Sequence, residues 1–214
     1  MRLGIFGGSF DPVHNGHLAL ARACQQQAAL DEVWFVPTAI QTLKQGGPQA
    51  TDAQRVEMLR LAIGDESSWR VCTLEIDRGG RSYTVDTLRQ IHEELPETEL
   101  FFLIGSDALR DVPRWKEPSE IFRMAMPLVV HRAGEPQPDF ESLESLCISD
   151  KRLQRIEMLP NLASSTEIRR RLASGQKFDE LVPKAVADYI ATNSIYSDGS
   201  RATLNIRRKQ EQED

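Results

Sequence analysis

The sequence has few cysteines and no long apolar run. Its three cysteines, Cys24, Cys72 and Cys147, lie far apart and form no CxxC or similar ligand spacing, which argues against a disulfide framework and a thiolate zinc site. The longest apolar stretches, such as Leu100–Ile104, are far shorter than the ~18 residues of a membrane-spanning helix. We therefore expect a protein of the reducing cytoplasm that has no membrane partner.

An excess of basic charge is also missing. The chain carries 26 Lys+Arg against 32 Asp+Glu, a net charge of −6, whereas a nucleic-acid binder usually presents a basic face. We expect no nucleic-acid partner, although a local group of cations can still bind a small anion. Because residues Met1–Phe6 run directly into glycines, we also expect no signal peptide.

The chain does contain a regular alternation of short apolar runs and amphipathic segments. Strands are predicted at Leu3–Phe6, Glu32–Val36, Arg70–Leu74, Leu100–Ile104, Pro127–His131 and Arg155–Met158. Apolar residues spaced three to four apart predict helices at Gly16–Ala29, Asp52–Ile63 and Val85–Leu95. Strands separated by helices predict an α/β protein with a Rossmann-like, doubly wound, mostly parallel sheet. Such sheets bind ligands at the carboxyl ends of their strands.

Toward the C-terminus the pattern changes to helices alone. Ser165–Ala173 and Pro183–Thr192 are predicted helices, and Gly175 is the expected stop between them. We expect the Rossmann-like domain to span residues 1–160 and a small helical subdomain to span residues 161–196. The polar residues 197–214 are expected to be disordered or to form a solvated helix.

The most informative segment is a glycine turn that carries two histidines. The first strand leads into Gly7 and Gly8, and a helix is expected to start near Gly16. Glycines let the backbone approach a bulky ligand, and amides at a helix start suit phosphate oxygens. Two of the four histidines of the chain, His14 and His17, lie three apart on this turn.

Three interpretations of this histidine pair are open from the residues alone. The turn can be purely structural, with a histidine that caps the helix. It can hold a metal with Asp11, although no third His or Cys stands at ligand spacing. It can also serve phosphate chemistry, with both imidazoles donating hydrogen bonds to negative charge that develops on a nucleotide.

Two motifs carry a resemblance to a known family. Gly7–His17 reads GGSFDPVHNGH and resembles the GG[ST]FDPxHxGH signature of the nucleotidyltransferase superfamily. Ser164–Arg169 reads SSTEIR and resembles the SSTxIR motif of the bacterial nicotinate-nucleotide adenylyltransferases. Matching features run from Leu3 to about Tyr196, so the resemblance covers nearly all of the chain except the tail.

The resemblance implies adenylyl transfer from ATP to nicotinate mononucleotide, which gives deamido-NAD (nicotinate adenine dinucleotide) and pyrophosphate in NAD biosynthesis. No covalent enzyme intermediate is formed, so alignment and charge neutralisation are what the protein must supply. Mg²⁺ is expected on the ATP phosphates, with no metal held by protein ligands, and the helical subdomain is expected to complete the ATP site. A homo-oligomer is left open. The alternatives are nicotinamide mononucleotide or phosphopantetheine as acceptor, a non-catalytic nucleotide-binding module, and a metal-dependent hydrolase.

The resemblance also implies which residues form the site. The catalytic group is His14, His17, Lys44 and Arg169. The ATP-binding group is Gly7, Gly8, Ser9, Phe10, His14, His17, Gly105, Asp107, Arg132, Ser164, Ser165 and Arg169. The group that binds nicotinate mononucleotide is Ser9, Lys44, Tyr83, Thr84, Asp107 and Trp115.

Several of these residues have simpler alternatives. Asp107, in a segment that resembles the family's IGxD, can merely cap the next helix. Arg169 can belong to a solvated face, because two further arginines follow it. Trp115 can be a core residue instead of the platform for the pyridine ring.

One further motif fits the family and one departs from it. Ser82-Tyr83-Thr84 matches the family's SYT motif, just before a helix whose free amides favour a carboxylate. After the second strand, however, the family usually carries PPHK, and this chain reads Gln41-Thr42-Leu43-Lys44. Lys44 retains the positively charged residue of the family motif, while the histidine and both prolines of that motif are absent from this chain.

Overall fold

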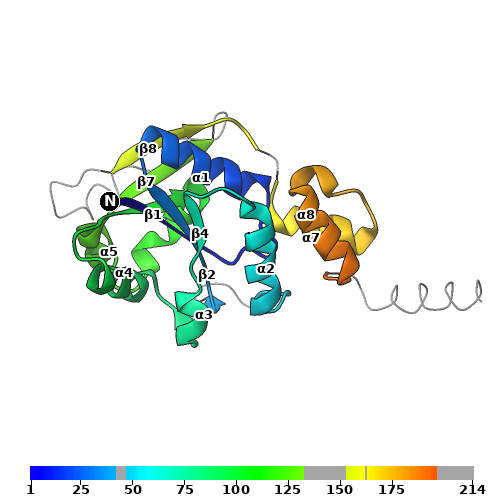
Figure 1. Cartoon of the computed structure of the whole chain (residues 1–214), viewed down its shortest axis with the longest axis horizontal. Coiled ribbons are helices and arrows are strands. Elements are labelled where there is room, and N and C mark those ends of the chain that lie inside the picture. Colours follow the sequence, from blue (N-terminus) through cyan, green and yellow to red (C-terminus); the bar gives the residue numbers. More distant parts are fainter. Residues whose placement is uncertain (42–46, 133–152, 162, 197–214) are drawn as a thin grey trace, which may run out of the picture.

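The computed structural model describes residues 1–41, 47–132, 153–161 and 163–196. Its centre is a six-stranded sheet with the order β4-β2-β1-β6-β7-β8, in which every neighbouring pair is parallel (Figure 1). The strands are β1 (Arg2–Gly8), β2 (Glu32–Pro37), β4 (Trp69–Val71), β6 (Glu99–Gly105), β7 (Ala125–Arg132) and β8 (Gln154–Met158). Because the order runs outward in both directions from β1 and β6, the sheet is doubly wound. The predicted fold class is confirmed.

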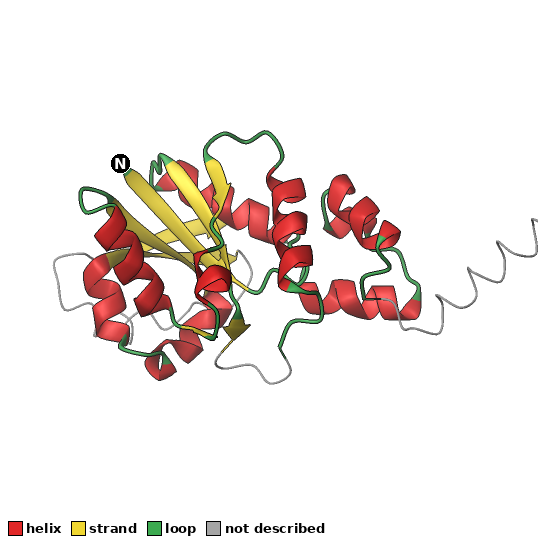
Figure 2. Cartoon of the chain, turned by 60° about the horizontal axis from the view of Figure 1, so that its bottom comes forward, coloured by secondary structure: helices red, strands yellow, loops and turns green. Residues whose placement is uncertain are grey.

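Helices cover both faces of this sheet, as Figure 2 shows. The side chains of β6 alternate between the two faces, because successive residues of a strand point to opposite sides. Phe101 and Leu103 join the core cluster that contains side chains of α1 (Asn15–Gln27) and α2 (Asp52–Ile63). Phe102 and Ile104 join the opposite cluster, with side chains of α4 (Thr84–Glu94) and α5 (Pro118–Met124).

The C-terminal part consists of α7 (Ser165–Ser174), the short 3-10 helix η2 (Asp179–Leu181) and α8 (Lys184–Thr192). Gly175 ends α7 with φ of 67°, as predicted for a C-terminal glycine. Ile168 and Ile190 are buried in the same cluster as α1 and α2, and α8 packs against α2. The division of the chain at residue 160 stays a prediction.

Some short elements differ from the prediction. The expected strand over Arg70–Leu74 is wrong beyond Val71, because Leu74 begins α3 (Leu74–Arg78). A second, two-stranded parallel sheet joins β3 (Ile40–Gln41) to β5 (Arg81–Ser82). These elements are too short for any periodicity to indicate them.

One further helix and the start of α4 lie near the ligand-binding edge. A 3-10 helix, η1 (Ser106–Arg114), follows β6 directly. Tyr83 is the N-cap of α4, one residue before the first helical residue Thr84, since the Tyr83 carbonyl accepts from the amides of Asp86 and Thr87. No helix in the described ranges is long and apolar enough to cross a membrane.

Candidate active site

The turn after β1 lies at the carboxyl edge of the sheet, where the strand order reverses. A side chain added at Gly7 would meet nothing within 4 Å, so this backbone is open to a ligand. The next residue is anchored, because the Gly8 carbonyl accepts from the amide of Thr38 at 2.9 Å. Gly105 ends β6, the strand paired beside β1. Gly7 and Gly105 therefore stand at the switch point where doubly wound sheets bind ligands.

The two histidines of the turn are held as a stacked pair. His14 is the N-cap of α1, and its backbone amide donates to His17 Nδ1 at 3.2 Å. The two rings stack with centroids 3.7 Å apart and an interplanar angle of 23°. Because Nδ1 of His17 accepts this hydrogen bond, a neutral ring carries its proton on Nε2. The ring donor of a neutral His17 is therefore Nε2–H.

Aromatic packing fixes the orientation of His17. The ring of Phe10 contacts it edge-on at a centroid distance of 5.0 Å, and the ring of Phe6 contacts Phe10 at 5.4 Å. Phe10 is 1% exposed and has a left-handed backbone with φ of 47°. A buried ring in that rare conformation requires surroundings that hold it. The Phe10 side chain therefore supports the histidine, and the predicted contact of Phe10 with ATP stays a prediction.

Gly16 is needed because two segments approach each other closely at the start of α1. A Cβ atom at this position would lie 3.0 Å from His14 Nδ1 and 3.1 Å from the Ala163 carbonyl. Both contacts are tighter than ordinary packing allows. Gly16 thus lets the segment before α7 lie directly against the histidine turn.

The N-terminus of α7 is tied to the histidine turn by side chains. Ser165 Oγ donates to the Pro12 carbonyl at 2.9 Å, and Arg169 Nη1 donates to the Asp11 carbonyl at 2.5 Å. The same guanidinium lies 3.6 Å from Asp11 Oδ2. Ser164 caps the helix by accepting from the amide of Glu167. The two predicted motifs, more than 150 residues apart along the chain, therefore meet in space.

Asp11 connects the turn to three other parts of the chain. Asp11 is 4% exposed, and its carboxylate accepts from the amides of Gln49 and Ala50 at 2.8 and 3.0 Å. It also accepts from Tyr196 Oη at 2.7 Å. Burial and the Asp11 carboxylate together raise the pKa of Tyr196, which stays a neutral donor. Within the described residues no group of three His, Cys, Asp or Glu could hold a metal ion, so Asp11 does not form the metal set considered from the sequence.

Arg55 in α2 is a site-supporting residue that the sequence interpretation missed. It is fully buried and donates to the carbonyls of Ser9 at 2.7 Å and Thr38 at 2.6 Å. It also pairs with Asp52 at 2.5 Å. One signal was available, because Arg55 lies one turn before the buried Leu59 and therefore on the apolar side of the helix. Through Arg55, α2 fixes the backbone at Ser9.

The candidate acceptor residues form a second group near the start of α4. Ser82 Oγ accepts from the amide of Ala39, which places Tyr83 beside the loop after β2. Trp115 follows η1 and packs edge-on against Phe102 on β6, with ring centroids 5.7 Å apart. The Trp115 side chain remains partly exposed, as a stacking platform requires.

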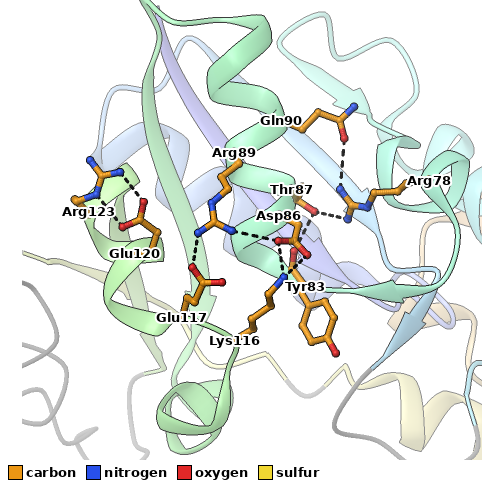
Figure 3. Close-up of polar contacts among 10 residues, drawn as sticks. All are labelled: Arg78, Tyr83, Asp86, Thr87, Arg89, Gln90, Lys116, Glu117, Glu120 and Arg123. Atoms are coloured by element: carbon orange, nitrogen blue, oxygen red, sulfur yellow. Dashed lines mark hydrogen bonds and ion pairs between the residues drawn. The ribbon is translucent and has the colours of Figure 1, made fainter.

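Lys116 brings the two acceptor segments together. Its ammonium lies 5.0 Å from the centre of the Tyr83 ring and donates to both oxygens of Asp86 at 2.9 and 3.0 Å. Figure 3 shows these side chains converging from α4 and from the segment after Trp115. The first residue of α4, Thr84, lies two positions before Asp86.

Three predicted site residues lie wholly or partly outside the described residues. Lys44 lies outside the described residues. The backbone of Asp107 lies in η1 and that of Arg132 at the end of β7, while their side chains are outside the description. Both backbones stand at the carboxyl edge of the sheet, beside the ends of β6 and β7.

An open cavity of about 730 Å³ lies elsewhere, between the end of β4 and helices α3 and α4. Trp34, Cys72, Arg78 and Gln90 are among the side chains that line it. None of the predicted site residues whose side chains are described lines it, so this cavity does not identify the site. The candidate site is defined by the hydrogen bonds of the histidine turn and by the acceptor residues.

Comparisons with known proteins agree with this geometry. A family model described as cytidylyltransferase-like matches residues 5–171. A Thermus thermophilus protein named "Probable nicotinate-nucleotide adenylyltransferase" is 41% identical over 198 residues, covering 92% of this chain and 100% of that protein. A protein of the same name from Dehalococcoides mccartyi is 39% identical, covering 92% of this chain and 97% of its own.

Solved structures agree on the fold. Nicotinic acid mononucleotide adenylyltransferase from Plasmodium falciparum, complexed with NaAD, superposes with a TM-score of 0.74 at 20% identity. The match covers 91% of this chain and 97% of that one. The same enzyme complexed with APC gives a TM-score of 0.72, with 91% and 96% covered.

Proposed function

Because the chain belongs to the cytidylyltransferase-like family and, within it, to the nicotinate-nucleotide adenylyltransferases, we propose that it makes deamido-NAD and pyrophosphate from nicotinate mononucleotide and ATP. The observation that carries the proposal is the docking of α7 on the histidine turn through Ser165 and Arg169. This contact brings imidazole, guanidinium and helix-start amide groups close to the open backbone of the turn at Gly7. Such a group of donors suits a triphosphate.

The reaction is a direct attack of the acceptor phosphate on the α-phosphate of ATP, with pyrophosphate leaving from the opposite side. His17 donates from Nε2 to the charge that develops on the phosphoryl oxygens, and the stacked His14 holds it in place. Arg169 binds the outgoing phosphates. These groups supply alignment and charge neutralisation, and no protein nucleophile takes part.

The remaining predicted residues take supporting roles. Gly7, Gly8 and Ser9 offer backbone to the phosphates, with Ser164 and Ser165 at the start of α7. Gly105, Asp107 and Arg132, at the ends of β6 and β7, bind ATP, and Asp107 also contacts the acceptor. Tyr83 and Thr84 receive the nicotinate carboxylate, Trp115 stacks on the pyridine ring, and Lys44 with Ser9 contacts the acceptor phosphate.

Mg²⁺ is the proposed metal, carried by the ATP phosphates. The described residues form no carboxylate cluster, and Mg²⁺ is commonly held by substrate phosphates with few protein ligands. Bound in this way it offsets the negative charge of the triphosphate. The cysteine usage supports a cytoplasmic location.

A pyrophosphate-release assay with ATP and nicotinate mononucleotide tests the function. Turnover is expected with nicotinate mononucleotide. Lower turnover is expected with nicotinamide mononucleotide and with phosphopantetheine, and phosphopantetheine has no ring that could stack on Trp115. Absence of turnover from pure, folded protein would contradict the proposal. ATP binding by calorimetry with no product from any acceptor would instead identify a non-catalytic module.

A further inference from the structure

Four charged side chains join the two acceptor segments, and nothing in the proposed mechanism uses them. Asp86 and Arg89 lie on α4, whereas Lys116 and Glu117 follow Trp115 directly. We call these four residues the acceptor clasp (Figure 3). We propose that Asp86 and Lys116 are positioning residues that hold Trp115 at the start of α4, and that the charge of Lys116 favours an acidic acceptor. This inference rests on the proposed function.

The first part of the proposal, that Asp86 and Lys116 hold Trp115 at the start of α4, rests on the geometry of Lys116. Its ammonium donates to Asp86 Oδ1 at 2.9 Å and to Oδ2 at 3.0 Å, and it lies 5.0 Å from the Tyr83 ring centre. One side chain therefore contacts two residues of the α4 start while its own backbone continues from Trp115. A second contact runs in parallel, because Arg89 pairs with both Asp86 and Glu117.

The backbone around Trp115 is fixed on both sides of the indole. On one side, its amide donates to the Val112 carbonyl at 3.0 Å. On the other, Glu117 has a left-handed backbone, with φ of 50° and ψ of 57°, and is the N-cap of α5. A non-glycine residue keeps that conformation only where its surroundings hold it. The Arg89–Glu117 contact supplies such a hold, so the clasp determines the direction in which the chain leaves Trp115.

The second part of the proposal, that Lys116 favours an acidic acceptor, rests on the charges of the clasp. Asp86 lies in the first turn of α4, where a carboxylate stabilises the helix but repels an anionic ligand. Lys116 and Arg89 balance Asp86 and Glu117, so the clasp is neutral as a whole. Without Lys116 the same surface carries one net negative charge beside Tyr83 and Thr84. That charge disfavours a nicotinate carboxylate more than a neutral nicotinamide.

The expected effects are moderate because the clasp is only partly shielded from water. The Lys116 side chain is 39% exposed and that of Asp86 is 31% exposed. Pairs of this kind contribute at most about a fivefold effect on an equilibrium. The effect should therefore appear as a change in KM for one substrate, with folding and chemistry left intact.

Steady-state kinetics of Lys116→Met, Asp86→Asn and Lys116→Arg test the inference, with kcat and KM measured for ATP and both mononucleotides. Lys116→Met should raise KM for nicotinate mononucleotide about fivefold and KM for nicotinamide mononucleotide about twofold. Asp86→Asn should raise KM less for nicotinate mononucleotide than for nicotinamide mononucleotide, because it loosens Trp115 but leaves the clasp with one net positive charge. Lys116→Arg should restore KM to within twofold of native. In every variant, kcat and the KM for ATP should remain near native.

Two comparisons separate this role from a structural one. Lys184→Met removes an ion pair with Asp188 on α8 and should leave all constants unchanged. The double variant Asp86→Asn with Lys116→Met should be no worse than Lys116→Met alone for the acidic acceptor, because both changes break one contact. Additive effects of the two changes, equal effects on both acceptors in Lys116→Met, or parallel losses in kcat and ATP binding would overturn the inference. Failure of the native enzyme to use nicotinate mononucleotide would instead contradict the proposed function.

Discussion

The phosphate side and the acceptor side of the candidate site are held by different physical means. On the phosphate side, Asp11 and Arg55 are almost completely buried, and most of their hydrogen bonds run to backbone groups of the turn and its neighbours. On the acceptor side, Asp86 and Lys116 are partly exposed and pair with each other. Buried donors and acceptors are costly to leave unpaired, whereas exposed ion pairs contribute little.

This difference matches what each side must do. In-line phosphoryl transfer depends on alignment, so small displacements of the histidine turn lower the rate. Recognition of an acceptor ring is a matter of affinity, and partly exposed contacts can adjust it in small steps. We therefore expect changes on the phosphate side to affect turnover and stability strongly, and changes on the acceptor side to affect mainly one KM.

The largest effect is expected from His17→Ala. The change removes a donor to the developing charge, and a single such donor is commonly worth about 100-fold to 1,000-fold in kcat. Steady-state pyrophosphate release measures it, and circular dichroism checks that the fold is intact. His92→Ala, an exposed histidine on α4, is the matched control and should keep native turnover. An unchanged rate for His17→Ala would remove this residue from the mechanism.

Arg55→Met is expected to give the largest loss of stability. The carbonyls of Ser9 and Thr38 would lose their donor in a dry environment, which should lower the free energy of unfolding by about 2–3 kcal/mol. Urea unfolding measures the change. Arg60→Met on the same helix removes only an exposed pair with Glu57 at 3.7 Å and should change stability little. Equal losses in the two variants would contradict the contrast between buried and exposed contacts.

Trp115→Leu tests the acceptor side alone. Loss of a stacking surface should raise the KM for nicotinate mononucleotide about tenfold, since stacking of a base on an aromatic ring is worth about 1–3 kcal/mol. The KM for ATP should remain unchanged, and Trp115→Phe should fall between native and Trp115→Leu. An equal rise in both KM values would show that Trp115 supports the core through Phe102 and not the acceptor.

Tyr196→Phe tests how much the C-terminal part contributes to the phosphate side. The change removes one hydrogen bond to Asp11, which retains the amides of Gln49 and Ala50. We expect a loss of about 1 kcal/mol in unfolding free energy and a smaller fall in kcat than for His17→Ala. Tyr189→Phe is the control, because among the described residues none hydrogen-bonds its hydroxyl. A loss no larger than that of the control would contradict a role for Tyr196 in fixing the turn.

The sequence predicted the sheet and the turn well because both depend on local patterns. Apolar periodicity placed α2 at Asp52–Ile63, as found, and strong alternation of strands and helices indicated the parallel sheet. Spacing puts Arg55 on the apolar side of α2 but identifies the partners of neither Arg55 nor Lys116, because those partners lie far away in the chain. An arginine inside an amphipathic helix is usually solvated, and only the fold shows that Arg55 faces the Ser9 carbonyl.

The smallest expected effect concerns Glu167, which pairs with Arg170 and Arg171 on the surface of α7. Hydrogen bonds from these arginines lower the pKa of Glu167 from its ordinary value of 4.5 to about 2. A lowered pKa in the folded state means that the carboxylate contributes stability above pH 4.5 and that this contribution is lost as the pH falls toward 2.

Glu167→Gln should therefore be slightly less stable than native at pH 7, and the difference should shrink as the pH falls below 4.5. Urea unfolding at pH 7, 5 and 3.5, with and without added salt, measures it. Glu120→Gln on α5 is the counterpart, because Arg123 lowers the pKa of Glu120 as well. Since Glu120 has one arginine partner in α5 and Glu167 has two in α7, the loss should be smaller for Glu120→Gln. Because both pairs are exposed, salt should weaken both effects, and kcat should not change. A pH-independent loss in Glu167→Gln would mean that its uncharged contacts, and not its ion pairs, stabilise α7 beside the phosphate side.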